Sequence, residues 1–97
     1  MTQGPRRLNA IEISPEYIGS YIEFRTVCRQ EYVDQGFGEF GAPVTIKGFL
    51  LAVSRGMSMA RAYTRVIVAV AAPNGLGPIR VTSTLGSHVT VTLSELG

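Results

Sequence analysis

The residue types that most often perform catalysis are sparse in this chain of 97 residues. It has one histidine, His88, which we expect on the solvent-facing side of the last strand, where no nucleophile, base and orienting group can be assembled around it. The seven carboxylates show no Asp-x-Asp or Glu-x-x-His spacing of the kind that indicates a metal site. They are Glu12, Glu16, Glu23, Glu31, Asp34, Glu39 and Glu95. We therefore expect no enzymatic activity, no metal and no cofactor.

Cys28 is the only cysteine, so the chain can form no intrachain disulfide and has no CxxC zinc or redox motif. Within an apolar strand pattern, a lone cysteine is expected to be a small buried side chain. The glycines at 36, 38, 41, 75, 77 and 86 are expected to be turn residues, because neither a Gly-Lys-Ser/Thr sequence nor a following helix is present as a phosphate loop requires.

The segment 29–43 interrupts the strand pattern with glycines and combines carboxylates with aromatic rings. Loops of this length in compact domains are often functional, and aromatic anchors inside a carboxylate rim would select a basic protein partner. The candidate partner-binding residues are Tyr32, Asp34, Phe37, Glu39 and Phe40. Alternatively, Phe37 and Phe40 fold back and cap one end of the core.

A second candidate site is basic. Eight of the nine positive residues are arginine, whose planar guanidinium binds phosphate and stacks on bases and aromatic rings. Arg55, Arg61, Tyr63 and Arg65 lie in or beside one strand connection, and on a shared surface they would follow a phosphate backbone and stack a base. Alternatively, these arginines form a solvated face. The net charge of +2 does not by itself require a nucleic-acid partner.

Period-two alternation of apolar and polar residues, typical of strands, dominates the sequence. It predicts strands at 20–28, 44–55, 63–71, 79–84 and 88–93, with a sixth over 8–13. Within 44–55 the apolar phase runs from Val44 and Ile46 to Phe49, Leu51 and Val53, which predicts a bulge or bend at Gly48. Ser14 and Pro15 begin a helical turn that Gly19 stops. A dense turn signal occupies 73–78.

The composition and these strands define the expected architecture. With 45% hydrophobic and 16% charged residues the chain folds, and its length allows one core. Five or six bent strands in so short a chain must close on themselves or pack as two orthogonal sheets. We predict an all-β antiparallel barrel or orthogonal sandwich over residues 8–97, with at most one short helical turn, preceded by a flexible arm over residues 1–7.

The order of strands and loops over residues 14–95 resembles small barrels of the Src-homology-3-like and Sm-like group. A glycine inside the second strand of the Sm-like type is matched by Gly48 in the run from Ile46 to Leu50. The late Arg-Gly or Lys-Gly pair with which that type contacts RNA is absent here between residues 76 and 85. The tryptophan with which the Src-homology type binds proline-rich peptides is also absent, so binding of such peptides is not expected.

The excess of arginine over lysine and the small size also resemble accessory and connector proteins of phages. The start of the chain shows no apolar signal sequence, and no apolar run is long enough to cross a membrane, so we expect a cytoplasmic or virion protein. The expected function is that of a non-enzymatic interaction module or assembly connector, with a protein partner or self-association. The alternative is a nucleic-acid-binding small barrel. No small-molecule substrate is evident.

Overall fold

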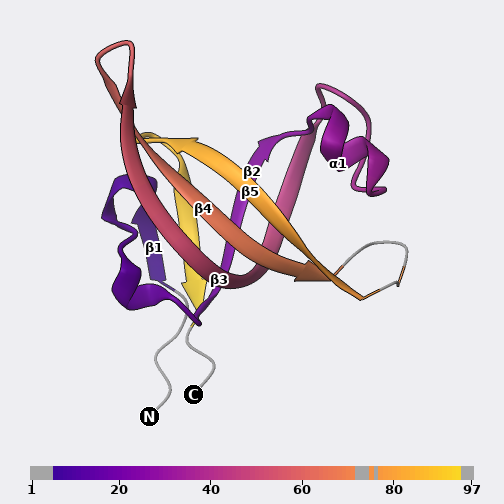
Figure 1. Cartoon of the computed structure of the whole chain (residues 1–97), viewed down its shortest axis with the longest axis horizontal. Helices are drawn as coiled ribbons and strands as arrows, with labels where there is room; N and C mark the ends of the chain where they lie inside the picture. Colours follow the sequence, from indigo (N-terminus) through magenta and orange to yellow (C-terminus); the bar gives the residue numbers. More distant parts are fainter. Residues whose placement is uncertain (1–5, 72–74, 76, 95–97) are drawn as a thin grey trace.

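The structure is a computed structural model that describes residues 6–71, 75 and 77–94. Strands contain 61% of these residues and form one antiparallel sheet with the order β1-β6-β2-β3-β4-β5 (Figure 1). Their bounds are β1 (Arg6–Asn9), β2 (Tyr21–Val27), β3 (Pro43–Ser58), β4 (Arg61–Ala71), β5 (Pro78–Gly86) and β6 (Thr90–Ser94). The all-β prediction is confirmed, and the five main strands lie close to their predicted positions.

Both ends of the chain differ in detail from the prediction. The sixth strand, expected at 8–13, is β1, which begins at Arg6 and gives way at Ala10 to a 3-10 helix. The expected arm of residues 1–7 is therefore shorter, because Arg6 and Arg7 pair with Leu93 and Thr92 of β6. Residues 1–5, part of the turn predicted at 73–78, and Glu95 lie outside the described residues.

Three short helical segments interrupt the strands: η1 (Ala10–Glu12), η2 (Pro15–Tyr17) and α1 (Gln30–Asp34). The segment η2 is the turn predicted after Ser14, with Pro15 at its first position. The other two were not predicted. The backbone N–H of Asn9 donates to Oε1 of Glu12 at 2.9 Å. This side-chain cap stabilises η1, a segment that no helical periodicity marks in the sequence.

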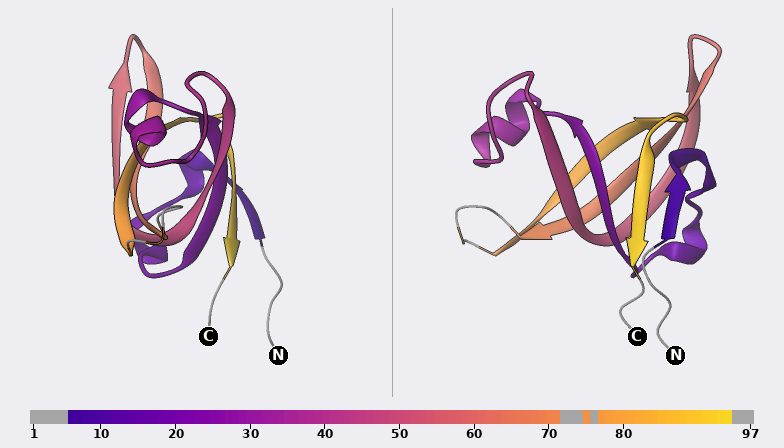
Figure 2. Two further views of the ribbon diagram at one scale, coloured as in Figure 1. Left: turned by 90° about the vertical axis from the view of Figure 1, so that its right-hand side faces the viewer. Right: turned by 180° about the vertical axis from the view of Figure 1, so that it is seen from behind.

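β3 organises the fold because its two halves pair with different neighbours. Residues 43–49 of β3 pair with β2, and residues 49–58 pair with β4. The strand bends strongly between these halves, which brings β4 and β5 across the core from β2 and β6 (Figures 1 and 2). The ladder does not close on itself, so β1 and β5 are its two edges.

The predicted bulge of β3 is displaced from Gly48 to Leu51. Val44, Ile46, Gly48 and Leu50 all face the core, and the register with β4 shifts between Leu50 and Ala52. Phe49 and Leu51, expected to point inward, are therefore 44% and 39% exposed. Because residues 49 to 51 are all apolar, alternation in the sequence does not decide which of them points inward.

Gly48 has a different role, which is close approach of two backbones at the bend. A Cβ atom at this position would collide with the carbonyl oxygen of Ala69, and it would lie 3.0 Å from Cγ1 of Val68. Only glycine allows β3 to pass this near to β4 without displacing main-chain atoms.

One hydrophobic core fills the space between the folded halves of the sheet. Alternate residues of β2 to β6 point into it, as period-two alternation requires. Ala10 and Ile13, at either end of η1, are fully buried, and η1 lies against β4 and β5. Cys28 is buried as predicted, with its Sγ 3.7 Å from the carbonyl oxygen of Arg29.

Candidate functional site

The segment between β2 and β3, residues 28–42, is held closed at its base by two backbone hydrogen bonds. The N–H of Cys28 donates to the carbonyl of Ala42, and the N–H of Gly41 donates to the carbonyl of Cys28. Between these points the chain forms α1, where a loop or flared hairpin was expected. We call residues 29–41 the α1 segment.

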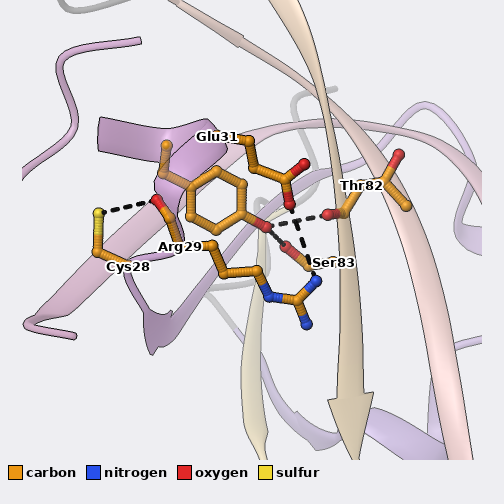
Figure 3. Close-up of polar contacts among 6 residues, drawn as sticks. Cys28, Arg29, Glu31, Thr82 and Ser83 are labelled. Atoms are coloured by element: carbon orange, nitrogen blue, oxygen red, sulfur yellow. Dashed lines mark hydrogen bonds and ion pairs between the residues drawn. The ribbon is translucent and has the colours of Figure 1, made fainter. Parts of the chain in front are cut away.

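Tyr32 is not an exposed anchor, in contrast to the prediction that it binds a partner. Its side chain is 3% exposed, and its phenol donates to the backbone carbonyl of Thr82 at 2.9 Å (Figure 3). The hydroxyl of Ser83 lies 2.7 Å from the same phenol oxygen. Because the carbonyl can only accept, the phenolic proton is used there, and Ser83 donates to Tyr32. These bonds attach α1 to the open edge of β5.

Phe37 is half-buried and caps the core. Its ring packs against Tyr32 with centroids 6.1 Å apart and an interplanar angle of 72°, an edge-to-face arrangement. The alternative in which a ring folds back therefore describes Phe37 but not Phe40.

Phe40 is 72% exposed, and the carboxylates around it in the sequence are exposed as well. Asp34 accepts a hydrogen bond from Nε2 of Gln30 at 3.0 Å, and Oε1 of Glu31 forms an ion pair with Nη1 of Arg29 at 3.8 Å. We define Asp34, Glu39 and Phe40 as the acidic surface. Of the five predicted partner-binding residues, these three are available to a partner.

The predicted basic residues divide between two faces of the β3–β4 hairpin. Arg61, Tyr63 and Arg65 alternate along β4 and share the outer face. Arg55 pairs with the buried Thr64 and so belongs to the inner face. Its guanidinium donates to the carbonyl of Ile13 at 2.8 Å, which ties the hairpin to the segment after η1.

Tyr63 lies flat against the hairpin because Gly56 is its cross-strand partner on β3. A Cβ atom at Gly56 would collide with the ring of Tyr63, so glycine makes room for it. The guanidinium of Arg65 lies 5.6 Å from the centroid of the same ring, within the range of a cation–π contact. The ring is thus already stacked by Arg65.

Arg80, at an outward position of the strand predicted over 79–84, belongs to the same outer face. It pairs with Ala69, which lies four residues after Arg65 and therefore on the same face of β4. At about 3.3 Å per residue, Arg61, Arg65 and position 69 are spaced by about 13 Å along the strand. We define Arg61, Arg65 and Arg80 as the basic row. A signal for it was present in the sequence, since residues 40–94 contain no aspartate or glutamate.

A cleft of about 660 Å³, lined by residues of β2, β3 and β4 that include Ala69 and Ala71 of the same outer face, was not predicted. Its wall includes Tyr21 and Phe49, whose rings meet edge to face with centroids 5.3 Å apart, and Lys47 lies at its margin. Phe49 is available to this cleft because it lies before the bulge and faces outward between the buried Gly48 and Leu50.

Two further features concern the described part of the chain. Residues 6–71, 75 and 77–94 contain no cluster of three His, Cys, Asp or Glu side chains that could hold a metal ion. Within the same residues, no helix has the length and apolar character needed to cross a bilayer. His88 is exposed, as expected, but it precedes β6 instead of lying in it.

Comparison of the chain with known proteins finds no matching family model, no matching curated protein and no matching solved structure. The function must therefore be argued from the arrangement of these surfaces.

Proposed function

We propose that this protein is a non-enzymatic interaction module, of the assembly or connector type, that binds a protein partner through the acidic surface. The observation that carries the proposal is Phe40, a large aromatic side chain that is 72% exposed in a segment otherwise anchored to the sheet. Aromatic residues are enriched among interface anchors, where burial of the ring supplies much of the affinity.

The anchoring of the α1 segment favours binding. Tyr32 is hydrogen-bonded to β5, and Phe37 packs on Tyr32, so Phe40 is presented from a support that is already ordered. The α1 segment then loses less conformational entropy when it binds a partner than an unstructured loop would. The exposed carboxylates of Asp34 and Glu39 in the same segment favour a basic partner surface.

The test compares Phe40→Ser with Phe37→Ser. Phe40→Ser should keep the melting temperature of the wild type and lose the partner in pull-down from host or virion extract, identified by mass spectrometry. Phe37→Ser should lower stability by about 2–4 kcal/mol, because it leaves a cavity beside Tyr32.

Ile18→Ser is the matched control, since Ile18 is 48% exposed and lies outside the α1 segment. The proposal fails if Phe40→Ser retains every partner that the wild type captures, or if Ile18→Ser loses the same partners.

A second candidate function is binding of nucleic acid along the outer face of β4 and β5. The observation that favours it is the basic row together with Tyr63 on one face, in strands that carry no carboxylate. Because Tyr63 is covered by Arg65, phosphate contacts rather than base stacking would dominate.

Fluorescence anisotropy with labelled single-stranded DNA at several salt concentrations tests this second function. Affinity should fall steeply with salt, and Arg65→Ala should weaken binding and reduce the salt slope by about one unit. Arg55→Ala should leave the slope unchanged, because Arg55 lies on the other face. Binding that is independent of salt would exclude this function.

A further inference from the structure

The tip of the β3–β4 hairpin exposes two large apolar side chains. Pairing of β4 with β5 begins at Tyr63, so residues 57–62 extend past the sheet with only each other as strand neighbours (Figures 1 and 2). In this tip Met57 is 70% exposed and Met59 is 95% exposed. Methionine is an adaptable contact residue and packs favourably against aromatic rings.

The backbone of the tip is strained in a way that holds Met59 outward. Met59 and Ala60 both have positive φ, 51° and 65°, which is the left-handed region that Asn-Gly occupies in two-residue hairpin turns. Strain of this kind at a non-glycine residue points toward a functional demand on the side chain.

A hollow of about 620 Å³ lies between the tip and the end of β5. Met59, Arg61, Tyr63 and Thr84 contribute to its wall. The hollow therefore combines an apolar side with an arginine, a combination that suits an aromatic ring followed or preceded by a carboxylate.

The same chain presents that combination on its other side. Glu39 and Phe40 are consecutive and exposed in the α1 segment, and α1 and the hairpin tip lie at opposite ends of the molecule's long axis (Figure 1 and the right view of Figure 2). One copy cannot bring its own Phe40 to its own hairpin. Opposite charge and matching apolar groups can meet only between two copies.

We infer that this protein associates with itself head to tail, with Phe40 of one copy in the hollow at the hairpin tip of the next copy. Glu39 then pairs with Arg61, and Met59 packs on the inserted ring. The inference rests on the proposed function, because it names a second copy as the partner of the acidic surface. Two different surfaces in contact generate a ring or an open filament rather than a symmetric dimer.

Charge reversal tests the pairing, with assembly measured by sedimentation velocity over a wide range of protein concentrations. Glu39→Arg and Arg61→Glu should each weaken self-association by about tenfold or more in Kd. An equimolar mixture of these two variants should assemble again, because every contact between unlike variants joins opposite charges, whereas every contact between like variants joins like charges. Assembly of the mixture also shows that both variants are folded.

Glu23→Arg and Arg25→Glu are the matched controls, since they reverse the same charges on β2, outside the acidic surface, the basic row and the hairpin tip. Both should assemble as the wild type does. All samples are treated with nuclease, and assembly that disappears on this treatment would overturn the inference in favour of bridging by nucleic acid.

Two other outcomes would also overturn head-to-tail association. A wild type that stays monomeric at every concentration overturns head-to-tail association, and the proposed function then stands or falls separately on the pull-down with Phe40→Ser. Loss of assembly in Arg61→Glu but not in Glu39→Arg would show that hairpins meet one another, and would likewise overturn it.

Discussion

Tyr32 shows how a single residue decides what the α1 segment can offer to a partner. Spacing in the sequence places it with Phe37 and Phe40 as one aromatic group. Its burial depends on Thr82 and Ser83, which lie about fifty residues later in the chain and provide the acceptor and donor for its phenol. No local pattern contains this information, so the sequence placed Tyr32 among the candidate partner-binding residues, whereas the structure buries it.

Removing only the hydroxyl, by Tyr32→Phe, should lower the free energy of unfolding by about 1–3 kcal/mol. The buried Ser83 hydroxyl and the Thr82 carbonyl each lose a partner, and unsatisfied polar groups carry a desolvation penalty. Urea unfolding followed by circular dichroism measures the change.

Tyr21→Phe is the control, because the phenol of Tyr21 has no hydrogen-bond partner among the described residues. It should change stability by less than about 0.5 kcal/mol. Equal effects of the two substitutions would show that the Tyr32 bonds contribute nothing specific.

At the scale of elements, β3 carries both the bend of the sheet and the hairpin tip. Its glycines at 48 and 56 serve different neighbours. Gly48 makes room for the backbone of Ala69, whereas Gly56 makes room for the ring of Tyr63. A side chain can rotate away from a new Cβ atom, but a carbonyl within a paired strand cannot.

We therefore expect Gly48→Ala to destabilise the protein by about 2–3 kcal/mol and Gly56→Ala by less than about 1 kcal/mol. Thermal or urea unfolding of the two variants side by side makes the comparison. The account of the bend is wrong if Gly48→Ala unfolds at the wild-type temperature or if the order of the two effects is reversed.

The hairpin turn allows stability and association to be separated. Replacing Met59 and Ala60 together by Asn and Gly supplies the residues that tolerate positive φ, and should stabilise the protein by about 1–2 kcal/mol. The same change removes the methionine that packs on Phe40 of the next copy, so self-association should weaken.

A higher melting temperature with weaker assembly is the expected result, measured by calorimetry and sedimentation velocity on one preparation. Assembly that strengthens along with stability would show that Met59 has no part in the contact.

At the scale of the whole molecule, the carboxylates are confined to one part of the described chain. All described carboxylates precede residue 40, and the five positive residues after it lie in β3, β4 and β5. They are Lys47, Arg55, Arg61, Arg65 and Arg80. The small net charge of +2 is therefore a sum over a molecule that has both an acidic surface and a basic row.

This separation predicts opposite responses in two assays. Glu39→Lys raises the net charge from +2 to +4, so it should strengthen retention on immobilised heparin while weakening self-association. Arg65→Glu should weaken retention on heparin, because it reverses a charge in the middle of the basic row. Elution salt concentration measures retention, and unchanged elution of both variants would show that the row does not act as a polyanion surface.

The sequence by itself determined which segments are strands. Side chains alternate between the two faces of any pleated strand, so period-two patterns mark strands whatever their partners are. For the same reason the all-β class, the outward positions of Arg61, Tyr63 and Arg65, and the burial of Cys28 could be predicted.

Only the tertiary structure decided where β3 changes partner, and with it which side chains share a surface. The bulge lies at Leu51 because β3 turns there from β2 toward β4, a choice made by strands distant in sequence. Because the bulge comes after Phe49, that ring stays on the outer face, while Arg55, beyond the bulge, lies on the inner face away from Arg61. Alternation gives the two faces of a strand, but the pairing of the whole sheet decides which face is covered.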